Sequence, residues 1–331
     1  MPALSVRVIE RALVKPFVIS SGARTTQSAL EVRLEDGGKI GIGEASGVSY
    51  RGETPQSLLA QVEAVRAEIE AGLDVERLQT LLPPGGARFA VDSALLDLQA
   101  KQSGTSVFDH LALPYANEPL TSAFTIVLDT PDAMREAAEE AQGLSLLKVK
   151  LGGKDGRDGA RAKAVRQGAP NARLIADANE GWTLNNLTAD AATLADAGFE
   201  LLEQPLPASA DAALEDFKSP IPLCGDESIQ DLNDLNRVAR RYDVINIKLD
   251  KCGGLTHAMA MRARLEALGK RLFVGCMICG VRAIAPAYAF ARNAEFVDLD
   301  GPLWLADDVE RLTLDKTGQL SAPSQQVWGG V

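Results

Sequence analysis

Residues 146–205 read LLKVKLGGKDGRDGARAKAVRQGAPNARLIADANEGWTLNNLTADAATLADAGFELLEQP. This stretch contains three short apolar segments that each end in charged or polar residues, and amphipathic stretches separate them. The segments have the length of buried strands, and Leu187–Ala197 between the last two repeats its apolar residues at helical spacing. Strands that alternate with helices predict βαβ units and a parallel sheet. The three segments are Leu146–Leu151, Arg173–Ala178 and Glu200–Glu203.

The same alternation runs through the chain from Thr121 onward. It gives eight candidate strands, spaced about 22 to 28 residues apart, which is the length of one βα unit. Eight such repeats predict an α/β fold, a closed barrel of the (β/α)8 type. A doubly wound sheet is the alternative, but Gly41–Ser46 lacks the third glycine of its phosphate turn and precedes the repeats. The five further strands are Ala123–Leu128, Pro222–Cys224, Val244–Leu249, Leu272–Cys276 and Phe296–Leu299.

The first hundred residues have a different pattern. Leu4–Glu10 and Ala29–Glu35 alternate polar and apolar residues as strands do, and Asp36–Gly38 is a turn before a third strand at Lys39–Ile42. Strands followed by a block of helices predict a separate α+β unit. The two segments with helical spacing are Thr54–Ala71 and Phe89–Lys101.

The composition excludes several classes of function. The 331 residues include 34 Lys and Arg against 45 Asp and Glu, a net charge of −11, so a nucleic-acid partner is not expected. No apolar stretch reaches the roughly 18 residues of a membrane helix, and Met1–Ile9 reads as a strand instead of a signal segment. The four cysteines do not form the pattern of a secreted disulfide framework. We therefore expect a soluble cytoplasmic protein without a membrane partner.

Three carboxylates end neighbouring strands of the predicted barrel. Asp177, Glu203 and Asp226 each stand at the carboxyl end of a strand, where the active sites of such barrels are built. Three like charges in one low-dielectric mouth repel unless a cation neutralises them, and hard oxygen donors suit Mg²⁺ better than Zn²⁺. Alternatively, each acid caps a turn or pairs with an arginine. The repetition over three successive units favours a Mg²⁺ site.

Three lysines flank these acids. Lys148 and Lys150 lie on one face of the second strand by period-two alternation, and Lys248 ends the sixth strand, across the barrel axis. A lysine base must be neutral, and a neighbouring ammonium, a cation and burial would all lower the pKa of Lys150. If Lys150 and Lys248 face a metal-anchored carboxylate from opposite sides, one removes the α-proton and the other returns a proton, which inverts the carbon. The alternative is that the lysines merely pair with the acids.

The complete set of strand-end residues resembles the enolase superfamily, muconate-lactonising subgroup. That resemblance implies a capping α+β domain and a modified (β/α)7β barrel, with a C-terminal segment that returns to the cap. We expect the cap at 1–116, the barrel with its metal and lysines at 117–304, and the returning segment at 305–331. The motifs that carry the resemblance are Lys148–Lys150, Asp177–Asn179, Glu203–Pro205, Asp226–Ser228 and Asn246–Lys248.

Further motifs are similar to those of the dipeptide epimerases within this superfamily. The resemblance implies Mg²⁺-dependent epimerisation of a dipeptide, with L-Ala-L-Glu from murein-peptide recycling as the expected substrate. It also implies that Asp298 and Asp300 bind the substrate ammonium group and that Arg24 binds the glutamate side-chain carboxylate, an arrangement with matched charges. The motifs are residues 17–24, 246–256, 275–277 and 298–302.

Other positions complete the expected site. Thr125 and Lys148 are expected to contact the substrate, and Asn179 and Glu227 to support the metal ligands. Residues 50–52 in a second loop of the cap are expected to close the pocket. One departure concerns Gly280, where relatives carry hydroxyl-bearing residues nearby, so added space there is expected to alter the dipeptide preference.

Several alternatives share the lysines and the metal. They are another dipeptide specificity, N-acylamino acid racemisation, o-succinylbenzoate synthesis and cycloisomerisation. None of the last three uses an ammonium-binding acid pair, so Asp298 and Asp300 discriminate between them and a dipeptide epimerase. A catalytically silent ligand-binding barrel is the non-enzymatic alternative, and it would gain little from two buried lysines such as Lys150 and Lys248. A homo-oligomer is compatible with each of these.

Overall fold

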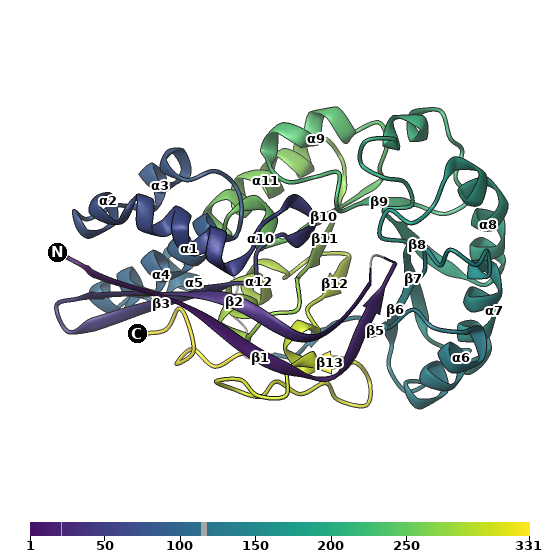
Figure 1. Ribbon diagram of the computed structural model, residues 1–331, viewed down its shortest axis with the longest axis horizontal. Helices are drawn as coiled ribbons and strands as arrows, with labels where there is room; N and C mark the ends of the chain where they lie inside the picture. The colour runs from purple at the N-terminus through teal and green to yellow at the C-terminus, as the bar shows by residue number, and fades with distance from the viewer. Residues whose placement is uncertain (21, 114–117) are drawn as a thin grey trace.

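A computed structural model describes residues 1–20, 22–113 and 118–331. The N-terminal unit begins with an antiparallel sheet of β1 (Ala3–Ile19), β2 (Gly22–Asp36) and β3 (Lys39–Ala45). Both strands of the β1–β2 hairpin are longer than the strands that the alternation predicted. The far half of the hairpin reaches the barrel, as Figure 1 shows. Among the described residues, none of the helices has the length and apolar character needed to cross a bilayer.

Helices cover one face of this sheet, and α4 packs directly on β3. That approach requires glycine in β3, since a Cβ added at Gly41 or Gly43 would lie 2.1 or 2.0 Å from a carbonyl oxygen of α4. The helix predicted over 54–71 is two helices, because the backbone leaves the helical conformation at Val65. The elements are η1 (Ser49–Arg51), α1 (Pro55–Ala64), α2 (Arg66–Glu70), α3 (Val75–Leu81), α4 (Gly86–Ser103) and α5 (Val107–His110).

All eight predicted barrel strands are present in one parallel sheet, in the order β12-β11-β10-β9-β8-β7-β6-β5. The backbone N–H of Ala123, just before β5, donates to Val297 O in β12 at 2.7 Å and brings the two edges together. The predicted α/β barrel with an N-terminal α+β unit is therefore confirmed. The strands are β5 (Phe124–Ile126), β6 (Leu146–Lys150), β7 (Arg173–Asp177), β8 (Phe199–Glu203), β9 (Leu223–Gly225), β10 (Val244–Ile247), β11 (Arg271–Gly275) and β12 (Phe296–Asp298).

Helices connect these strands on the outside of the barrel (Figure 1). The connection after β8 contains only the 3-10 helix η2 (Asp211–Glu215), and β12 is followed by another, η3 (Gly301–Trp304). The barrel thus ends without an eighth α-helix, as the (β/α)7β resemblance implied. The helices are α6 (Pro131–Glu140), α7 (Asp158–Gly168), α8 (Leu184–Asp196), α9 (Leu232–Val238), α10 (Leu249–Cys252), α11 (Leu255–Ala267) and α12 (Val281–Phe290).

One buried apolar residue from each strand position forms a separate cluster inside the barrel, which we call the floor ring. Because side chains alternate along a strand, the residues two positions further on also point inward, one layer closer to the carboxyl ends. The floor ring therefore sets which residues face the mouth of the barrel. It consists of Ala123, Leu146, Ile175, Leu201, Cys224, Val244, Phe273 and Phe296.

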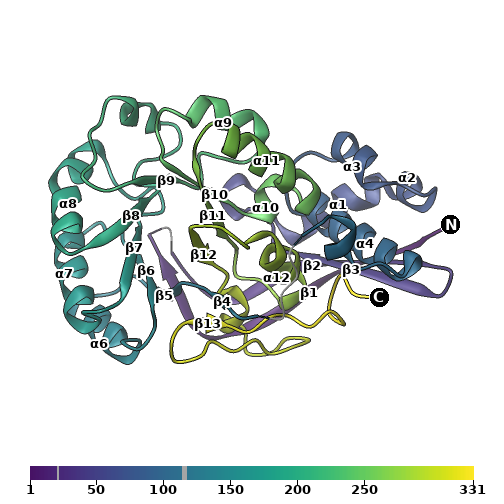
Figure 2. The ribbon, with the colours of Figure 1, turned by 180° about the vertical axis from the view of Figure 1, so that it is seen from behind.

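The last residues run back along the molecule to the N-terminal unit (Figure 2). On the way, β13 (Gln319–Leu320) pairs antiparallel with β4 (Leu120–Thr121). Trp328 is fully buried, donates from Nε1 to Ser93 O in α4 at 2.9 Å and packs edge-on against Phe108. The expected boundary between residues 116 and 117 lies outside the described residues, as does Ser21 of the 17–24 motif. The domain division stays a prediction.

Replacing Trp328 tests the energetic importance of this returning segment. Trp328→Ala removes a fully buried ring and a hydrogen bond, so we expect the free energy of unfolding to fall by about 3–5 kcal/mol. The measurement is urea unfolding followed by circular dichroism. Val331→Ala, at an exposed position, is the control and should leave the free energy of unfolding unchanged. A loss below about 1 kcal/mol for Trp328→Ala would mean that the segment contributes little.

Candidate active site

The residues one layer above the floor ring are mostly polar, and we call this layer the second ring. Each follows a floor-ring residue by two positions, so the barrel geometry gathers side chains that lie more than 170 residues apart in sequence. Apart from the glycine, these residues are at most 6% exposed. The second ring consists of Thr125, Lys148, Asp177, Glu203, Asp226, Asn246, Gly275 and Asp298.

Lys148 lies at the centre of the second ring, and its side chain is 1% exposed. Its Nζ is 2.7 Å from Glu203 Oε2 and 2.9 Å from Asp298 Oδ2. A third carboxylate oxygen, Asp177 Oδ2, is 3.1 Å away. Burial alone would lower the pKa of Lys148, but these carboxylates outweigh burial and raise it well above its usual value. Lys148 is therefore a permanent cation that links the predicted metal ligands to Asp298.

Lys150 ends β6 one layer higher and lies against the first of the predicted metal ligands. Its Nζ donates to Asp177 Oδ2 at 2.7 Å and to Asn179 Oδ1 at 3.1 Å. The amide of Asn179 in turn donates to Glu227 Oε1 at 3.1 Å. Burial raises the pKa of Asp177, whereas the charges of Lys150 and Lys148 lower it, with a net result of about 2. Asp177 is thus held as a carboxylate by two lysines.

Lys248 follows β10 and lies against Asp226, at the other end of the row of acids. Its Nζ donates to Asp226 Oδ2 at 2.6 Å. A further lysine, Lys251 in α10, is 1% exposed and donates to both Asp226 Oδ1 and Asp226 O. Burial raises the pKa of Asp226, but the charges of Lys248 and Lys251 outweigh it and hold the pKa well below the usual range. Lys150 and Lys248 therefore stand at opposite ends of the acidic row.

Buried carboxyl groups outnumber buried ammonium groups in this cluster. Burial and the charge of Asp177 raise the pKa of Glu203 to about 7, and burial and the charge of Asp226 raise that of Glu227 to about 8. The cluster contains four ammonium groups and six carboxyl groups, so full ionisation would leave two surplus negative charges, and the raised pKa values of Glu203 and Glu227 mean that bound protons relieve part of this surplus. They are Lys148, Lys150, Lys248 and Lys251, with Asp177, Glu203, Asp226, Glu227, Asp298 and Asp300.

The donor set fits a hard divalent cation. Glu227 Oε2 is buried without a hydrogen bond, and Glu203 Oε2 has only the ion pair with Lys148, which is not aligned as a hydrogen bond. Three carboxylates on adjacent strands are oxygen donors of the kind that Mg²⁺ prefers. Within the described residues, however, the acidic side chains as they stand form no set of three ready to hold a metal, since lysines lie against them. The assignment of Asp177, Glu203 and Asp226 as ligands stays a prediction.

The two aspartates at the end of β12 lie on the other side of Lys148. Asp300 Oδ2 accepts from Thr125 N at 2.9 Å and from Trp304 Nε1 at 3.2 Å. Burial and the charge of Asp298 raise the pKa of Asp300 to about 6. Asp298 Oδ1 is buried without a hydrogen bond. These contacts fix the position of both carboxyl groups. Lys148 pairs with Asp298, and Asp300 has no cation of its own among these contacts.

A cavity of about 620 Å³ lies above the second ring, between the barrel and the N-terminal unit. The predicted ligands Asp177, Glu203 and Asp226 lie beneath it, covered by the lysines. Arg24 comes from the far half of the hairpin, where its guanidinium donates to Gln27 Oε1 at 3.1 Å. The predicted site residues that line the cavity are Arg24, Thr125, Lys148, Lys150, Asn179, Glu227, Lys248, Asp298 and Asp300.

The N-terminal unit is hydrogen bonded to the loops that carry the site. Ser20 Oγ donates to Asn179 O at 3.0 Å, and an Arg51 side-chain N–H donates to Glu227 O at 3.0 Å. Tyr50, next to Arg51, lines the cavity as expected. Ser20 and Arg51, from two loops of this unit, therefore bind backbone carbonyls that follow the predicted metal ligands Asp177 and Asp226 by two residues and one residue.

The added space expected at Gly280 is not present, whereas the effect of this position on dipeptide preference stays a prediction. A Cβ added at Gly280 would lie 2.4 Å from Glu44 Oε1, and Gly280 N donates to that same oxygen at 2.9 Å. Glu44 is itself paired with Arg11. The space beside Gly280 is therefore filled by an ion pair from the N-terminal unit, and the glycine adds no room to the cavity.

Three buried polar residues next to the site were not among the predicted site residues. Asn246 donates to Glu203 Oε1 at 2.7 Å, and counting two residues from Val244 of the floor ring would have found it. Lys251 lies on a helix, so strand alternation gives no signal for it. Gln204 follows Glu203 and has a positive φ of 36°, which the sequence does not indicate.

Two families and several relatives match this chain. Residues 3–112 match the family described as mandelate racemase / muconate lactonizing enzyme, N-terminal domain, and residues 132–326 match enolase C-terminal domain-like. The chain is 43% identical to an L-Ala-D/L-Glu epimerase of Escherichia coli K12 over 96% of this chain and 99% of the relative. It is 42% identical to an N-acetyl-D-glutamate racemase of a Pseudoalteromonas species over 78% and 81%, respectively.

Solved structures agree over the whole chain. An enolase family member from Agrobacterium tumefaciens with homology to dipeptide epimerases, solved with sodium and L-Ala-L-Glu, superposes with a TM-score of 0.95. It is 41% identical and covers 99% of this chain and 100% of its own. A dipeptide epimerase from Enterococcus faecalis, solved with Mg and L-Leu-L-Tyr, has a TM-score of 0.87, 27% identity and coverage of 97% and 96%.

Because Lys251 is almost completely buried, we expect its substitution to lower the stability of the fold. Lys251→Met leaves part of the Asp226 charge uncompensated, so we expect the free energy of unfolding to fall by about 3 kcal/mol. Lys101→Met is the matched control, because Lys101 also donates to a carboxylate and a carbonyl, Asp97 and Ile40, but is partly exposed. Lys101→Met should lower the free energy of unfolding by about 1 kcal/mol. Equal losses in urea unfolding would mean that burial does not strengthen the contacts of Lys251.

Proposed function

Because the chain belongs to the mandelate racemase / muconate lactonizing enzyme family of the enolase superfamily, we propose that it is a Mg²⁺-dependent dipeptide epimerase. The proposed substrates are L-Ala-L-Glu and L-Ala-D-Glu, because the Escherichia coli relative is an L-Ala-D/L-Glu epimerase and the Agrobacterium tumefaciens relative was solved with L-Ala-L-Glu bound. The observation that carries the proposal is the placement of Lys150 against Asp177 and of Lys248 against Asp226. Two potential bases thus flank one row of carboxylates from opposite ends.

In this proposal Asp177, Glu203 and Asp226 hold Mg²⁺, the ion with which the Enterococcus faecalis relative was solved. When bound, Mg²⁺ supplies positive charge that stabilises the enolate form of the substrate carboxylate. With all six carboxyl groups ionised, the cluster would have two surplus negative charges, which match such a cation, and binding it would displace protons and release the lysines from some of their ion pairs. Residues 1–116 with 305–331 act as the cap, and residues 117–304 as the catalytic barrel.

The two lysines perform the proton transfers. One lysine, as the free amine, removes the α-proton of the glutamate residue, and the carbon becomes planar. The other lysine, as the ammonium, donates a proton to the opposite face, which inverts the configuration. Lys148 remains charged throughout, because three carboxylates surround it. The hydrogen bonds from the N-terminal unit close the cavity and keep water away from the planar intermediate.

The two ends of the dipeptide are recognised by opposite charges. The Asp298 and Asp300 pair binds the ammonium group of the alanine residue, for which the unpaired Asp298 Oδ1 is available. Arg24 at the cavity mouth binds the side-chain carboxylate of the glutamate residue. Asn179 and Glu227 steady the metal ligands, and Thr125 orients Asp300 through its backbone N–H.

A second candidate function is racemisation of an N-acylated glutamate, because one relative is an N-acetyl-D-glutamate racemase. Such a substrate shares the carboxylates but has no ammonium group. The buried acid pair favours the dipeptide, since Lys148 compensates only one of the two carboxylates and the other would face the uncharged acyl group.

The cellular setting is also part of the proposal. All four cysteines are free thiols, the form that a reducing compartment maintains. A cytoplasmic enzyme that epimerises L-Ala-Glu would act on peptides released from murein during recycling of the cell wall.

Isotope exchange tests the two-base assignment. Lys150→Ala and Lys248→Ala should each abolish epimerisation, because each removes one of the two proton carriers. Each variant should still exchange the α-proton of one epimer with deuterium in D₂O, and the two variants should label opposite epimers. The readout is the mass and NMR spectrum of L-Ala-L-Glu and L-Ala-D-Glu after incubation with Mg²⁺. Full turnover by either variant would rule out the scheme.

Substrate choice tests the acid pair. Asp300→Asn removes a buried charge that faces the substrate ammonium, so kcat/KM for L-Ala-L-Glu should fall by about 100-fold. Activity on N-acetyl-glutamate should not fall, since it has no ammonium group. Asp307→Asn, an exposed aspartate beyond the site, is the matched control. Equal losses on both substrates would remove Asp300 from ammonium recognition.

A further inference from the structure

Gln204 uses its entire side-chain amide to connect the ends of β8 and β9. It is fully buried, and its Oε1 accepts from the backbone N–H groups of Asp226 at 2.9 Å and Ser228 at 3.1 Å. Its Nε2 has three acceptors within reach for its two hydrogens: Leu206 O and Ser228 Oγ, both at 2.8 Å, and the hydroxyl of Tyr242 at 3.0 Å. The amide thus bridges the residue after Glu203 to the backbone of Asp226.

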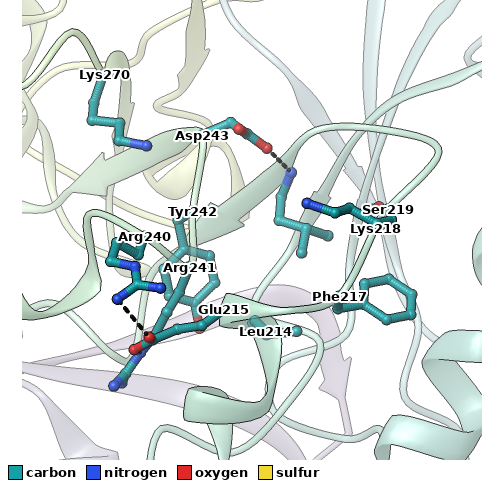
Figure 3. Close-up of a pocket in the computed structure, with 11 residues that line it drawn as sticks. Leu214, Glu215, Phe217, Lys218, Ser219, Arg240, Arg241, Tyr242, Asp243 and Lys270 are labelled. Carbon is teal, nitrogen blue, oxygen red and sulfur yellow. Dashed lines mark hydrogen bonds and ion pairs between the residues drawn. The ribbon is translucent and has the colours of Figure 1, made fainter.

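Tyr242 reaches Gln204 from outside the strands. It is one of the residues that line a pocket of about 290 Å³ near η2, together with Arg241 (Figure 3). Its ring passes β9 so closely that a Cβ added at Gly225 would lie 2.8 Å from it. Its hydroxyl then meets both Gln204 Nε2 and Asp211 Oδ2, the latter at 3.0 Å.

The partners of Gln204 fix the orientation of its amide. Two backbone N–H groups, of Asp226 and Ser228, can only donate, so the atom that faces them is Oε1. Arg241 pairs with Asp211 at 2.6 Å, so Asp211 accepts the single hydroxyl proton of Tyr242. The Tyr242 oxygen is then an acceptor for Gln204 Nε2 and for the Ser228 hydroxyl, 3.1 Å away, and it supports this orientation of the amide.

Asp226 needs such support because it is the first residue beyond a three-residue strand, β9. The strand ladder pairs Cys224 and Gly225 with β10 and does not extend to Asp226. We propose that Gln204, oriented by Tyr242, is a positioning residue that holds Asp226 in place as a ligand of Mg²⁺. The inference rests on the proposed function. Neither Gln204 nor Tyr242 lines the active-site cavity of about 620 Å³.

Both residues are uncharged, which makes the test specific. Their substitution leaves the net charge of the site unchanged, so a change in Mg²⁺ affinity reports geometry. The measurement is isothermal titration calorimetry of MgCl₂ into the full chain after removal of metal with EDTA. Thermal unfolding without metal is recorded in parallel, because a purely structural role would lower the melting temperature alone.

Gln204→Met should raise the Kd for Mg²⁺ by about tenfold to 100-fold, the usual effect of losing a partner that orients a metal ligand. Tyr242→Phe keeps the ring and should raise it by about threefold to fivefold, as expected for one hydrogen bond. The double variant should bind no more weakly than Gln204→Met, because Tyr242 acts through Gln204. At saturating Mg²⁺, kcat should return to near the unmodified value in Tyr242→Phe.

Two matched controls lie far from the site. Tyr288→Phe removes a buried hydroxyl that donates to Glu118 O and Leu320 O, and Gln79→Met removes an amide that donates to Val75 O in the N-terminal unit. Both should lower the melting temperature and leave the Kd for Mg²⁺ within about twofold.

Unchanged Mg²⁺ affinity in both Gln204→Met and Tyr242→Phe would overturn the inference. If Gln204→Met does not fold, Tyr242→Phe alone decides, with the same criterion. Failure of the unmodified chain to bind Mg²⁺ would contradict the proposed function itself, so the two failures are distinguishable.

Discussion

The mouth of this barrel holds more carboxyl groups than lysines, and the surrounding structure is arranged around the repulsion between these acids. At an effective dielectric constant near 20, two like charges about 4 Å apart repel by roughly 4 kcal/mol. Lys148, Lys150, Lys248 and Lys251 offset most of this repulsion. In the proposed function the remaining carboxyl groups attract the divalent cation, which competes with the lysines for the same oxygens.

The position of this charge follows from the floor ring. Eight apolar residues close the inside of the barrel, and the strict period of two along each strand then determines which side chains form the next layer. A shift of one residue in any strand would turn its polar residue outward and bring an apolar one to the mouth. The apolar floor is thus as necessary for the chemistry as the polar ring above it. It excludes water from below, while the N-terminal unit covers the site from above.

Much of this arrangement could be predicted from the sequence. The eight strands and the convergence of Lys148, Lys150 and Lys248 with the acids follow from repeat spacing and alternation, which are local properties. The extent of the β1–β2 hairpin could not be predicted in this way, since its far half is stabilised by contacts with the barrel. The error at Gly280 has the same origin: Glu44 and Arg11, more than 230 residues away, fill the space beside it. Lys251 and Gln204 were missed because neither follows the strand alternation.

The most direct test of the two-base, one-metal account is a crystal structure of the chain with Mg²⁺ and L-Ala-L-Glu. The account predicts Mg²⁺ within about 2.0–2.1 Å of oxygens of Asp177, Glu203 and Asp226. It also predicts the Nζ atoms of Lys150 and Lys248 on opposite faces of the glutamate Cα. The account would be contradicted if both nitrogens lay on one face of that carbon, or if other residues coordinated Mg²⁺ in place of these three acids.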